Sequence, residues 1–343
     1  MILLVEDGCK WDGIKLTYRL QGHLHIGYLP RGGTVVAHTR RYLPGKNFWG
    51  AVTKRATEYL FPEPEGKDYG SIGEKIKKYF RFSYFYVTEN GLIYPPLFTD
   101  EGLVYGSGSG SKMTEGQFEY RYIGNRVSTE IDSGTGTTME GSLHEIEYIK
   151  KRYRNARGNI KNTEVSGCVW VKKGARLPDR ENSSDVAIEI SDEGIFIKAP
   201  YQSAKCNLLD EISIGGEQNY GFGRIEIVKV EKEKELTGRY SLSEEGVNVS
   251  LSSGEHILAH VPCNKNLSDV CFCGDIELLG GREYAAGKKR FGKPGARIVT
   301  PQYHFAPGSR LFRRNNDGAK MDFELQYDGT MNLVRREIEE RPR

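Results

Sequence analysis

Short runs of alternating apolar and polar residues recur along this chain and limit the folds that it can adopt. They read IKLTYRL at 14–20, RFSYFYVTE at 81–89, FEYRYIG at 118–124, VAIEI at 186–190, GIFIKA at 194–199 and RIEIVKV at 224–230. Alternation with a period of two buries one face of a strand and leaves the other in water. With 41 glycines and 20 tyrosines, the pattern predicts a strand-rich protein with few helices.

Two segments are expected to be helical. In NFWGAVTKRATEYL, at 47–60, Phe48, Val52 and Ala56 recur at helical spacing and can share one face. Trp49 lies near that face and is more typical of a core than of an open stacking platform. A second helix is expected over 72–79.

The segment at 99–116 is poor in apolar residues and contains GSGSGS, so we interpret it as a mobile insertion rather than as part of a sheet. It is either a surface loop or a finger that faces a ligand. A chain of 343 residues usually forms two domains, and the charged run KVEKEKELT at 229–237 suggests the boundary. We therefore expect an N-terminal domain over 1–232 and a smaller one over 233–343.

Composition narrows the class of protein. No apolar run is long enough to cross a bilayer, so a cytoplasmic protein is expected. The 49 basic and 46 acidic residues give a formal charge of only +3, which excludes a blanket of positive charge but allows a local basic groove. The six cysteines do not resemble a disulfide framework, so reduced thiols are expected.

A zinc site is a weaker alternative for part of the cysteines. The four candidate ligands in HVPCNKNLSDVCFC are His260, Cys263, Cys271 and Cys273. A Cys-x-Cys pair reaches one metal poorly, and no CxxC pair accompanies it. Alternation in VCFC more simply places both thiols on one strand face, so we expect neither a metal nor another cofactor.

The Gly-rich segment GGEQNYGFGR at 215–224 follows a strand-like run. Its glycines let backbone N–H groups approach an anion, Tyr220 and Phe222 offer stacking faces, and Arg224 supplies hydrogen-bond donors. The loop therefore suits a nucleic-acid backbone. A hairpin that needs several positive φ angles is the structural alternative.

Several segments together resemble CRISPR-associated RAMP proteins. LHIGYLPRGGTVVAHTRRYLPGKNFWGAVTKRA at 24–56 is similar to their opening strand, LHIG turn and Pro-Gly entry into the first helix. VSTEIDSGTGTTMEGSLHEIEYI at 127–149 resembles their next conserved block, and GGEQNYGFGRIEIV at 215–228 falls where they carry a Gly-rich loop. The resemblance implies an α+β fold with two ferredoxin-like, RNA-recognition-type βαββαβ domains, and assembly with CRISPR RNA in class 1 effector complexes.

The C-terminal third of the chain resembles one particular type of RAMP protein. GGREYAAGKKRFGKPGARIV at 280–299, followed by YHFAPGSRLF at 303–312, looks like the ending of the Cas-five type, which caps the 5′ handle of the guide in type III-like complexes. That resemblance implies partners: CRISPR RNA, backbone RAMP subunits, a separate nuclease subunit and, indirectly, target RNA or DNA. A repeated backbone subunit that binds guide and target is an alternative.

The RNA-binding prediction combines these blocks with the basic run KKRYRNARGNIK at 150–161. Lysines and arginines beside a helix N-terminus and in this run supply positive charge for phosphates. The predicted contacts are His25, Arg40, Arg41, Lys46, Asn47, Lys54, Arg55, Arg152, Arg154, Gly215, Gly216, Gln218, Asn219, Tyr220, Gly221, Phe222, Gly223, Arg224, Arg282, Lys288, Lys289 and Arg290.

Catalysis is not expected of this subunit. RAMP backbone subunits that cut target RNA carry an aspartate in a loop soon after the first helix, and Asp68 and Glu89 do not stand in a matching context. The alternative is a metal-independent, guide-processing endoribonuclease that uses His25 or His38 as the base for a 2′-hydroxyl. Because His25 lies in an LHIG turn that non-catalytic members share, a structural or RNA-contacting role is preferred.

Overall fold

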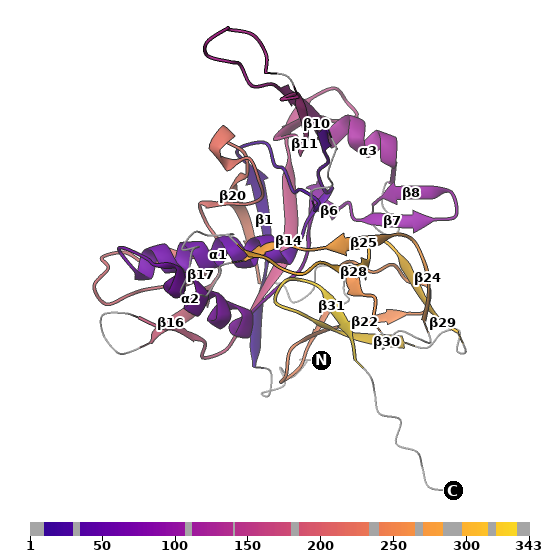
Figure 1. The fold of residues 1–343 in the computed structure, drawn as a ribbon. Coiled ribbons are helices and arrows are strands. Elements are labelled where there is room, and N and C mark those ends of the chain that lie inside the picture. Colours follow the sequence, from indigo (N-terminus) through magenta and orange to yellow (C-terminus); the bar gives the residue numbers. More distant parts are fainter. Residues whose placement is uncertain are drawn as a thin grey trace, which may run out of the picture.

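The computed structural model describes residues 10–29, 35–106, 112–139, 141–179, 185–232, 240–264, 270–283, 297–314 and 320–334. At its centre lies an eight-stranded sheet (Figure 1). Its path runs β19 (Ile212–Ser213), β20 (Arg224–Glu231), β1 (Trp11–Leu20), β14 (Glu164–Lys172), β5 (Phe85–Glu89) and β3 (Tyr42–Leu43). β4 (Phe80–Phe82) also pairs with β14, and β6 (Leu92–Ile93) with β5.

The four central strands follow one half of the predicted topology. In the order β20-β1-β14-β5 all neighbours are antiparallel, as in a βαββαβ unit whose strands stand in the order 4-1-3-2. The first crossover contains α1 (Gly45–Leu60) and α2 (Gly66–Tyr79). Where the second helix would stand, the described chain forms a four-stranded sheet of β15 (Arg176–Leu177), β16 (Val186–Ser191), β17 (Gly194–Ile197) and β18 (Cys206–Asn207).

Alternation along the central strands separates two cores. Ile14, Val169 and Phe85 point toward the core that contains the apolar side of α1 and α2 and the β15–β18 sheet. Trp170 and Tyr86, their neighbours along the strands, point to the opposite face, where a second core includes strands of the C-terminal third. The sheet face that RNA-recognition domains leave open is therefore covered in this protein.

All described elements after Glu231 are strands, so a second βαββαβ unit is not confirmed. One sheet contains β21 (Tyr240–Leu242), β22 (Val247–Ser252), β30 (Lys320–Leu325) and β31 (Met331–Leu333). A second contains β23 (Val261–Pro262), β28 (Gln302–Phe305) and β25 (Ile276–Leu279). Two further pairs join β24 (Val270–Cys273) to β29 (Arg310–Arg313), and β26 (Arg282–Glu283) to β27 (Arg297–Ile298). The predicted boundary, between 232 and 233, lies at the start of residues 233–239, which are outside the described range.

The insertion after β6 corrects the prediction for 99–116. β7 (Pro96–Thr99), β8 (Gly102–Tyr105) and β9 (Met113–Thr114) form a three-stranded sheet, so part of this segment is sheet. Tyr105 and Met113 are buried, which anchors the sheet on both sides of GSGSGS. The central residues 107–111 lie outside the described range.

The helix predicted at 47–60 was confirmed, whereas the start of the second helix and the predicted strand at 118–124 differ from the structure. α2 begins at Gly66, six residues before the expected start, because the Asp68 carboxylate accepts the Glu65 N–H at 2.9 Å and closes the first turn. The predicted strand at 118–124 was wrong over most of its length. Thr114 and Gln117 form reciprocal hydrogen bonds that start α3 (Glu115–Tyr122) instead.

After α3 the chain forms an arm that projects from the body (Figure 1). β10 (Ile123–Ser128) and β11 (His144–Ile149) pair antiparallel, and β2 (Val36–Ala37) lies parallel to β11. β12 (Arg152–Arg154) and β13 (Ile160–Asn162) form a separate hairpin. In the described part of the chain, no helix is both long and apolar enough to cross a bilayer.

Candidate nucleic-acid interface

A groove of about 790 Å³ brings together segments that are far apart in the sequence. It is lined by the LHIG turn, the first turns of α1, the start of the Gly-rich loop and the end of β25. Its lining residues include His25, Gly27, Arg40, Pro44, Lys46, Asn47, Lys54, Gly215, Gly216, Gln218, Gly280 and Gly281. Many of the predicted RNA contacts therefore lie in one depression.

The Gly-rich loop lies against the LHIG turn through close backbone contacts at two glycines. Gly215 has φ +84°, and a Cβ there would lie 2.2 Å from the His25 carbonyl oxygen. Gly223 has φ +85°, and its N–H donates to the His23 carbonyl at 2.7 Å. Gly221 also has a positive φ but faces open space. The loop glycines thus serve both close packing and turn geometry.

The two aromatic residues of the loop have different roles. Tyr220 is 67% exposed, and the Arg126 guanidinium lies 5.6 Å from its ring centroid. Phe222 is 7% exposed and packs edge-on against His23 and Tyr148. The prediction that Phe222 offers an open stacking face is therefore wrong, because its ring supports the loop from below. Tyr220 is free to stack.

The remaining loop residues lie at the surface. Gln218, Asn219 and Tyr220 form a short 3₁₀ turn. Glu217 directly precedes this turn and has a φ of 57°. The Gln218 amide donates to the Gly215 carbonyl at 3.0 Å and closes this turn. Arg224 is exposed at the start of β20.

The N-terminus of α1 opens into the groove without an acidic residue. Pro44 precedes the helix, no side chain caps it, and the first turn contains no carboxylate. No carboxylate of the helix itself offsets the partial positive charge of this end, although Asp328 of the β30–β31 turn lies close to it. Lys46 and Asn47 are partly exposed there, and the Lys46 side chain lies beside Gly281.

The two later basic residues of α1 diverge. Lys54 lines the groove and lies 3.9 Å from Glu58 in an exposed pair. Arg55 does not line it and instead lies 3.4 Å from Glu211. Of these two side chains, only Lys54 can reach a ligand in the groove as it stands.

Arg40 and Arg41 are held by carboxylates. Arg40, 5% exposed, forms an ion pair with Glu277 of β25 and donates to the Gly27 carbonyl. Arg41 pairs with Glu119 and lies 3.7 Å from Glu147. Both guanidiniums are largely neutralised within the protein, although Arg40 still lines the groove.

Glu277 is the centre of a buried polar network. It accepts hydrogen bonds from Tyr42 at 3.0 Å and from His260 Nε2 at 2.9 Å, while Tyr84 donates to His260 Nδ1 at 2.6 Å. Burial opposes ionisation of Glu277, but the His260 hydrogen bond and the Arg40 charge outweigh it and lower its pKa to about 2. Burial lowers the pKa of His260, so its imidazole is neutral.

The two candidate histidine bases share one glutamate. His25 Nδ1 donates to the Glu147 carbonyl at 2.7 Å, and His38 Nδ1 lies 3.0 Å from the Glu147 carboxylate. His25 is 8% exposed, whereas the His38 side chain is 60% exposed. The sequence prediction did not identify Glu147 as the partner of these two histidines, through its backbone carbonyl for His25 and its carboxylate for His38.

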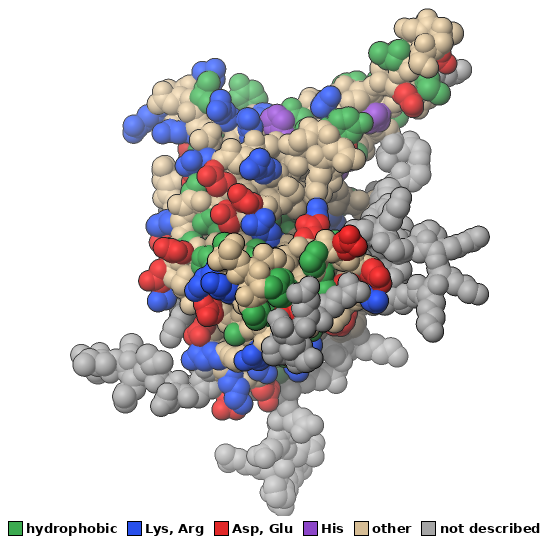
Figure 2. All heavy atoms as spheres, turned by 90° about the vertical axis from the view of Figure 1, so that its left-hand side faces the viewer, with side chains coloured by type: hydrophobic (Ala, Val, Ile, Leu, Met, Phe, Trp, Pro, Cys, Tyr) green, Lys and Arg blue, Asp and Glu red, His purple; other side chains and the backbone are tan. Residues whose placement is uncertain are grey.

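The basic run after β11 forms the β12–β13 hairpin. Arg152 donates to Asn162 at 3.3 Å and Arg154 to the Gly158 carbonyl at 2.9 Å, and both are exposed. Tyr153 between them is buried at 6% exposure. Figure 2 shows Lys and Arg side chains intermixed with Asp and Glu on one face of the molecule, as the small net charge predicts.

The C-terminal basic residues are described only in part. The backbone of Arg282 belongs to β26, while Lys288, Lys289 and Arg290 lie outside the described residues. Among the four candidate zinc ligands, His260 is committed to Tyr84 and Glu277, and Cys271 and Cys273 are exposed on β24. Within the described residues no group of three or more potential ligands surrounds a common point.

Some residues that line the groove were not among the predicted RNA contacts. Glu217 and Asp328 add carboxylates to the lining, and Leu279, Gly280 and Gly281 close it from the end of β25. Asp328 reaches α1 because the tight turn of the β30–β31 hairpin lies there, close enough that a Cβ on Gly45 would be 2.9 Å from the Asp328 carbonyl oxygen. Only the glycine pair at 280–281 hinted at a close approach.

No family model and no curated protein matches the chain. Among solved structures, it resembles a chain of the type III-B Cmr-beta bound to cognate target RNA and AMPPnP, with 13% identity and a TM-score of 0.48 over 88% of this chain and 86% of that one. A chain of the Cmr-beta bound to cognate target RNA gives 14% identity and 0.46, with the same coverage. A chain of the apo state gives 12% and 0.35, over 64% of this chain and 97% of that one.

Proposed function

We propose that this chain is a guide-RNA-binding subunit of a class 1, type III-like CRISPR effector ribonucleoprotein, and that it holds the 5′ handle of the guide. One observation carries the proposal. Two of the blocks that resemble RAMP proteins, 24–56 with its LHIG turn and entry to α1 and 215–228 with the Gly-rich loop, line one groove although they are far apart in the sequence. A guide strand in this groove would meet both blocks.

The groove offers complementary chemistry for a short single strand. Lys46, Lys54 and the uncapped N-terminus of α1 supply positive charge for phosphates. Tyr220 offers a face on which one base can stack, and Arg126 lies beside its ring. Glu217 lines both the groove and the small hollow beside Tyr220, so the two surfaces are continuous.

The subunit is proposed to bind the guide RNA without cutting it, while a different subunit supplies the nuclease.

The first test of the proposed groove is the binding of labelled repeat RNA at fixed salt. The double variant Gly221→Val/Arg224→Ala and the single variant Lys46→Ala should each bind more weakly and remain folded. Lys78→Ala, which removes an exposed lysine on α2, is the matched control. Unchanged affinity in both variants, with folding intact, would exclude the groove at Lys46 and the adjoining Gly-rich loop as the binding site.

A guide-processing endoribonuclease is the second candidate, favoured by the pairing of two imidazoles with Glu147. His25 lines the groove and donates through Nδ1, which leaves Nε2 as a potential acceptor for a 2′-hydroxyl proton. Purified protein that cuts repeat RNA in a metal chelator, with the activity lost in His25→Ala or His38→Ala, would favour this candidate. Stoichiometry separates a repeated backbone subunit, which occurs several times per complex, from a cap, which occurs once.

A further inference from the structure

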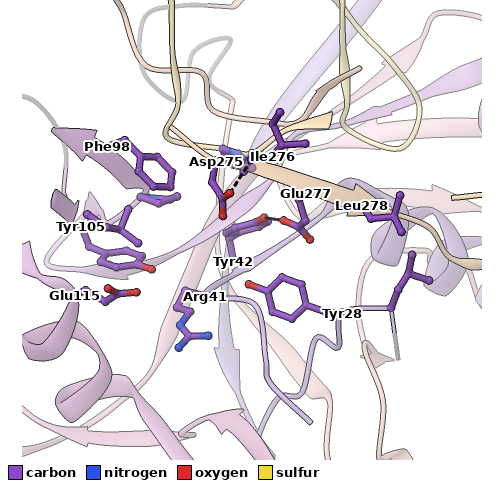
Figure 3. Close-up of a pocket in the computed structure, with 15 residues that line it drawn as sticks. Tyr28, Arg41, Tyr42, Phe98, Tyr105, Glu115, Asp275, Ile276, Glu277 and Leu278 are labelled. Carbon is purple, nitrogen blue, oxygen red and sulfur yellow. Dashed lines mark hydrogen bonds between the residues drawn. The ribbon is translucent and has the colours of Figure 1, made fainter. Parts of the chain in front are cut away.

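A second cavity, of about 380 Å³, lies between the β7–β9 sheet and β25 and shares no lining residue with the groove (Figure 3). Four aromatic rings form much of its wall: Tyr28, Tyr42, Phe98 and Tyr105. They come from four separate segments, and Tyr105 is fixed by stacking on Phe118 at 4.0 Å between ring centroids. The cavity is therefore a built feature of the tertiary structure.

The hydroxyl of Tyr105 is an unused polar group in this cavity. The residue is only 3% exposed, its hydroxyl has no hydrogen-bond partner among the described residues, and Figure 3 shows it pointing into the cavity. Burial raises the pKa of Tyr105, so the hydroxyl stays protonated. The Tyr105 hydroxyl is therefore open to the cavity, where a ligand can replace water as its hydrogen-bond partner.

Two carboxylates at the wall are also without a cation. Glu115 and Asp275 line the cavity, and no basic side chain pairs with either of them in the described chain. The third carboxylate, Glu277, is already satisfied by Arg40 and His260. Arg41 contributes little free positive charge, because it is committed to Glu119 and to the Thr39 carbonyl at 2.6 Å.

We propose that this cavity binds an arginine side chain presented by a partner protein. Aromatic rings attract a cation placed over their faces, and carboxylates add charge-assisted hydrogen bonds. A planar guanidinium uses both features, since it stacks on tyrosine and offers forked donors. A nucleotide fits less well, because Glu115 and Asp275 repel its phosphate. The site is independent of the RNA groove.

The probe is the blocked tripeptide acetyl-Gly-Arg-Gly-amide, titrated into the full chain at millimolar concentration and followed by calorimetry or NMR. The citrulline version has nearly the same shape but no charge, and it should bind about tenfold or more weakly. Asp275→Asn and Tyr105→Phe should each weaken the arginine peptide severalfold, by about tenfold for the charge change. Glu63→Gln, which removes an exposed carboxylate between α1 and α2, should leave binding unchanged.

Four outcomes would overturn the proposal. Arginine and citrulline peptides could bind equally, which would remove the role of charge. A lysine peptide could bind more tightly than the arginine peptide, which would remove the role of the planar group. Guanosine monophosphate could compete for the same chemical-shift changes more effectively than the peptide, which would make the cavity a nucleotide site. Absence of binding by the unmodified protein to any of these probes would also reject it, without reference to the folding of a variant.

Discussion

Arg40 and Glu277 form a buried ion pair between residues 237 positions apart in the sequence. Arg40 precedes α1, whereas Glu277 lies on β25, so the pair connects the N-terminal sheet to the C-terminal third. Leu279, Gly280 and Gly281, which follow on the same strand end, line the groove. We therefore expect the position of this groove wall to depend on the pair.

Removal of one partner of the pair should be strongly destabilising. Glu277→Ala leaves the Arg40 guanidinium buried without its counterion and also removes the acceptor of Tyr42 and His260. The expected loss in the free energy of unfolding is about 3–5 kcal/mol, measured by urea denaturation. Glu244→Ala, which breaks an exposed pair with Lys10, should cost less than about 1 kcal/mol. Equal costs for the two variants would contradict the buried role of Glu277.

Stability should fall as pH decreases below about 6.5. Burial lowers the pKa of His260 in the folded protein below its ordinary value of 6.5, so the unfolded chain binds a proton first. The free energy of unfolding then rises with pH across this window. Glu277 adds a second loss between about pH 4.5 and 2, because its folded pKa is lowered to about 2. Denaturation at successive pH values measures both losses.

Gly215 should be intolerant of even one added carbon. Gly215→Ala requires a positive φ for alanine and places Cβ 2.2 Å from the His25 carbonyl oxygen. Gly91→Ala is the control, since Gly91 has φ +80° but faces open space. We expect Gly215→Ala to lower the free energy of unfolding by at least about 1 kcal/mol more than the control. A difference near zero would mean that the loop moves away from the LHIG turn at little cost.

The β12–β13 hairpin should contribute to RNA affinity through charge alone. Arg152→Ala and Arg154→Ala remove exposed guanidiniums whose protein contacts are single hydrogen bonds. If each arginine contacts one phosphate, each variant should make the negative slope of log affinity against log salt shallower by about 1. The change should be the same for all RNA sequences. Arg176→Ala, at an exposed arginine of β15, should leave the slope unchanged. Sequence-dependent losses would instead indicate base contacts.

Local patterns predicted much of the central fold. The period of two identified β1, β5, β16, β17 and β20, and helical spacing identified α1, because each pattern reflects burial on one side of a local element. The capping box at Thr114 and Gln117 was missed, so a helix was read as a strand. Long-range features had no local signal. Nothing near Arg40 in the sequence indicates Glu277, and nothing near Phe222 shows that its ring lies against His23.

The candidate site was predicted in outline. The LHIG turn, the entry to α1 and the start of the Gly-rich loop were identified from sequence, and the fold places them in one groove. Arg55 was included because the sequence predicts that it lies on the helix but does not show where its side chain points. In the structure the Arg55 side chain points toward Glu211. The charge balance of the groove also depends on Glu217 of the Gly-rich loop and on Asp328, which only the tertiary structure brings beside α1.

The most direct test of the proposed function is to purify the protein from cells that contain its neighbouring genes and to sequence the RNA that accompanies it. The account predicts guide RNAs with one uniform 5′ handle, a single copy of this subunit per complex, and loss of that RNA in Gly221→Val/Arg224→Ala. Absence of bound RNA from the purified complex, or RNA retained equally by the folded double variant, would contradict the central claim.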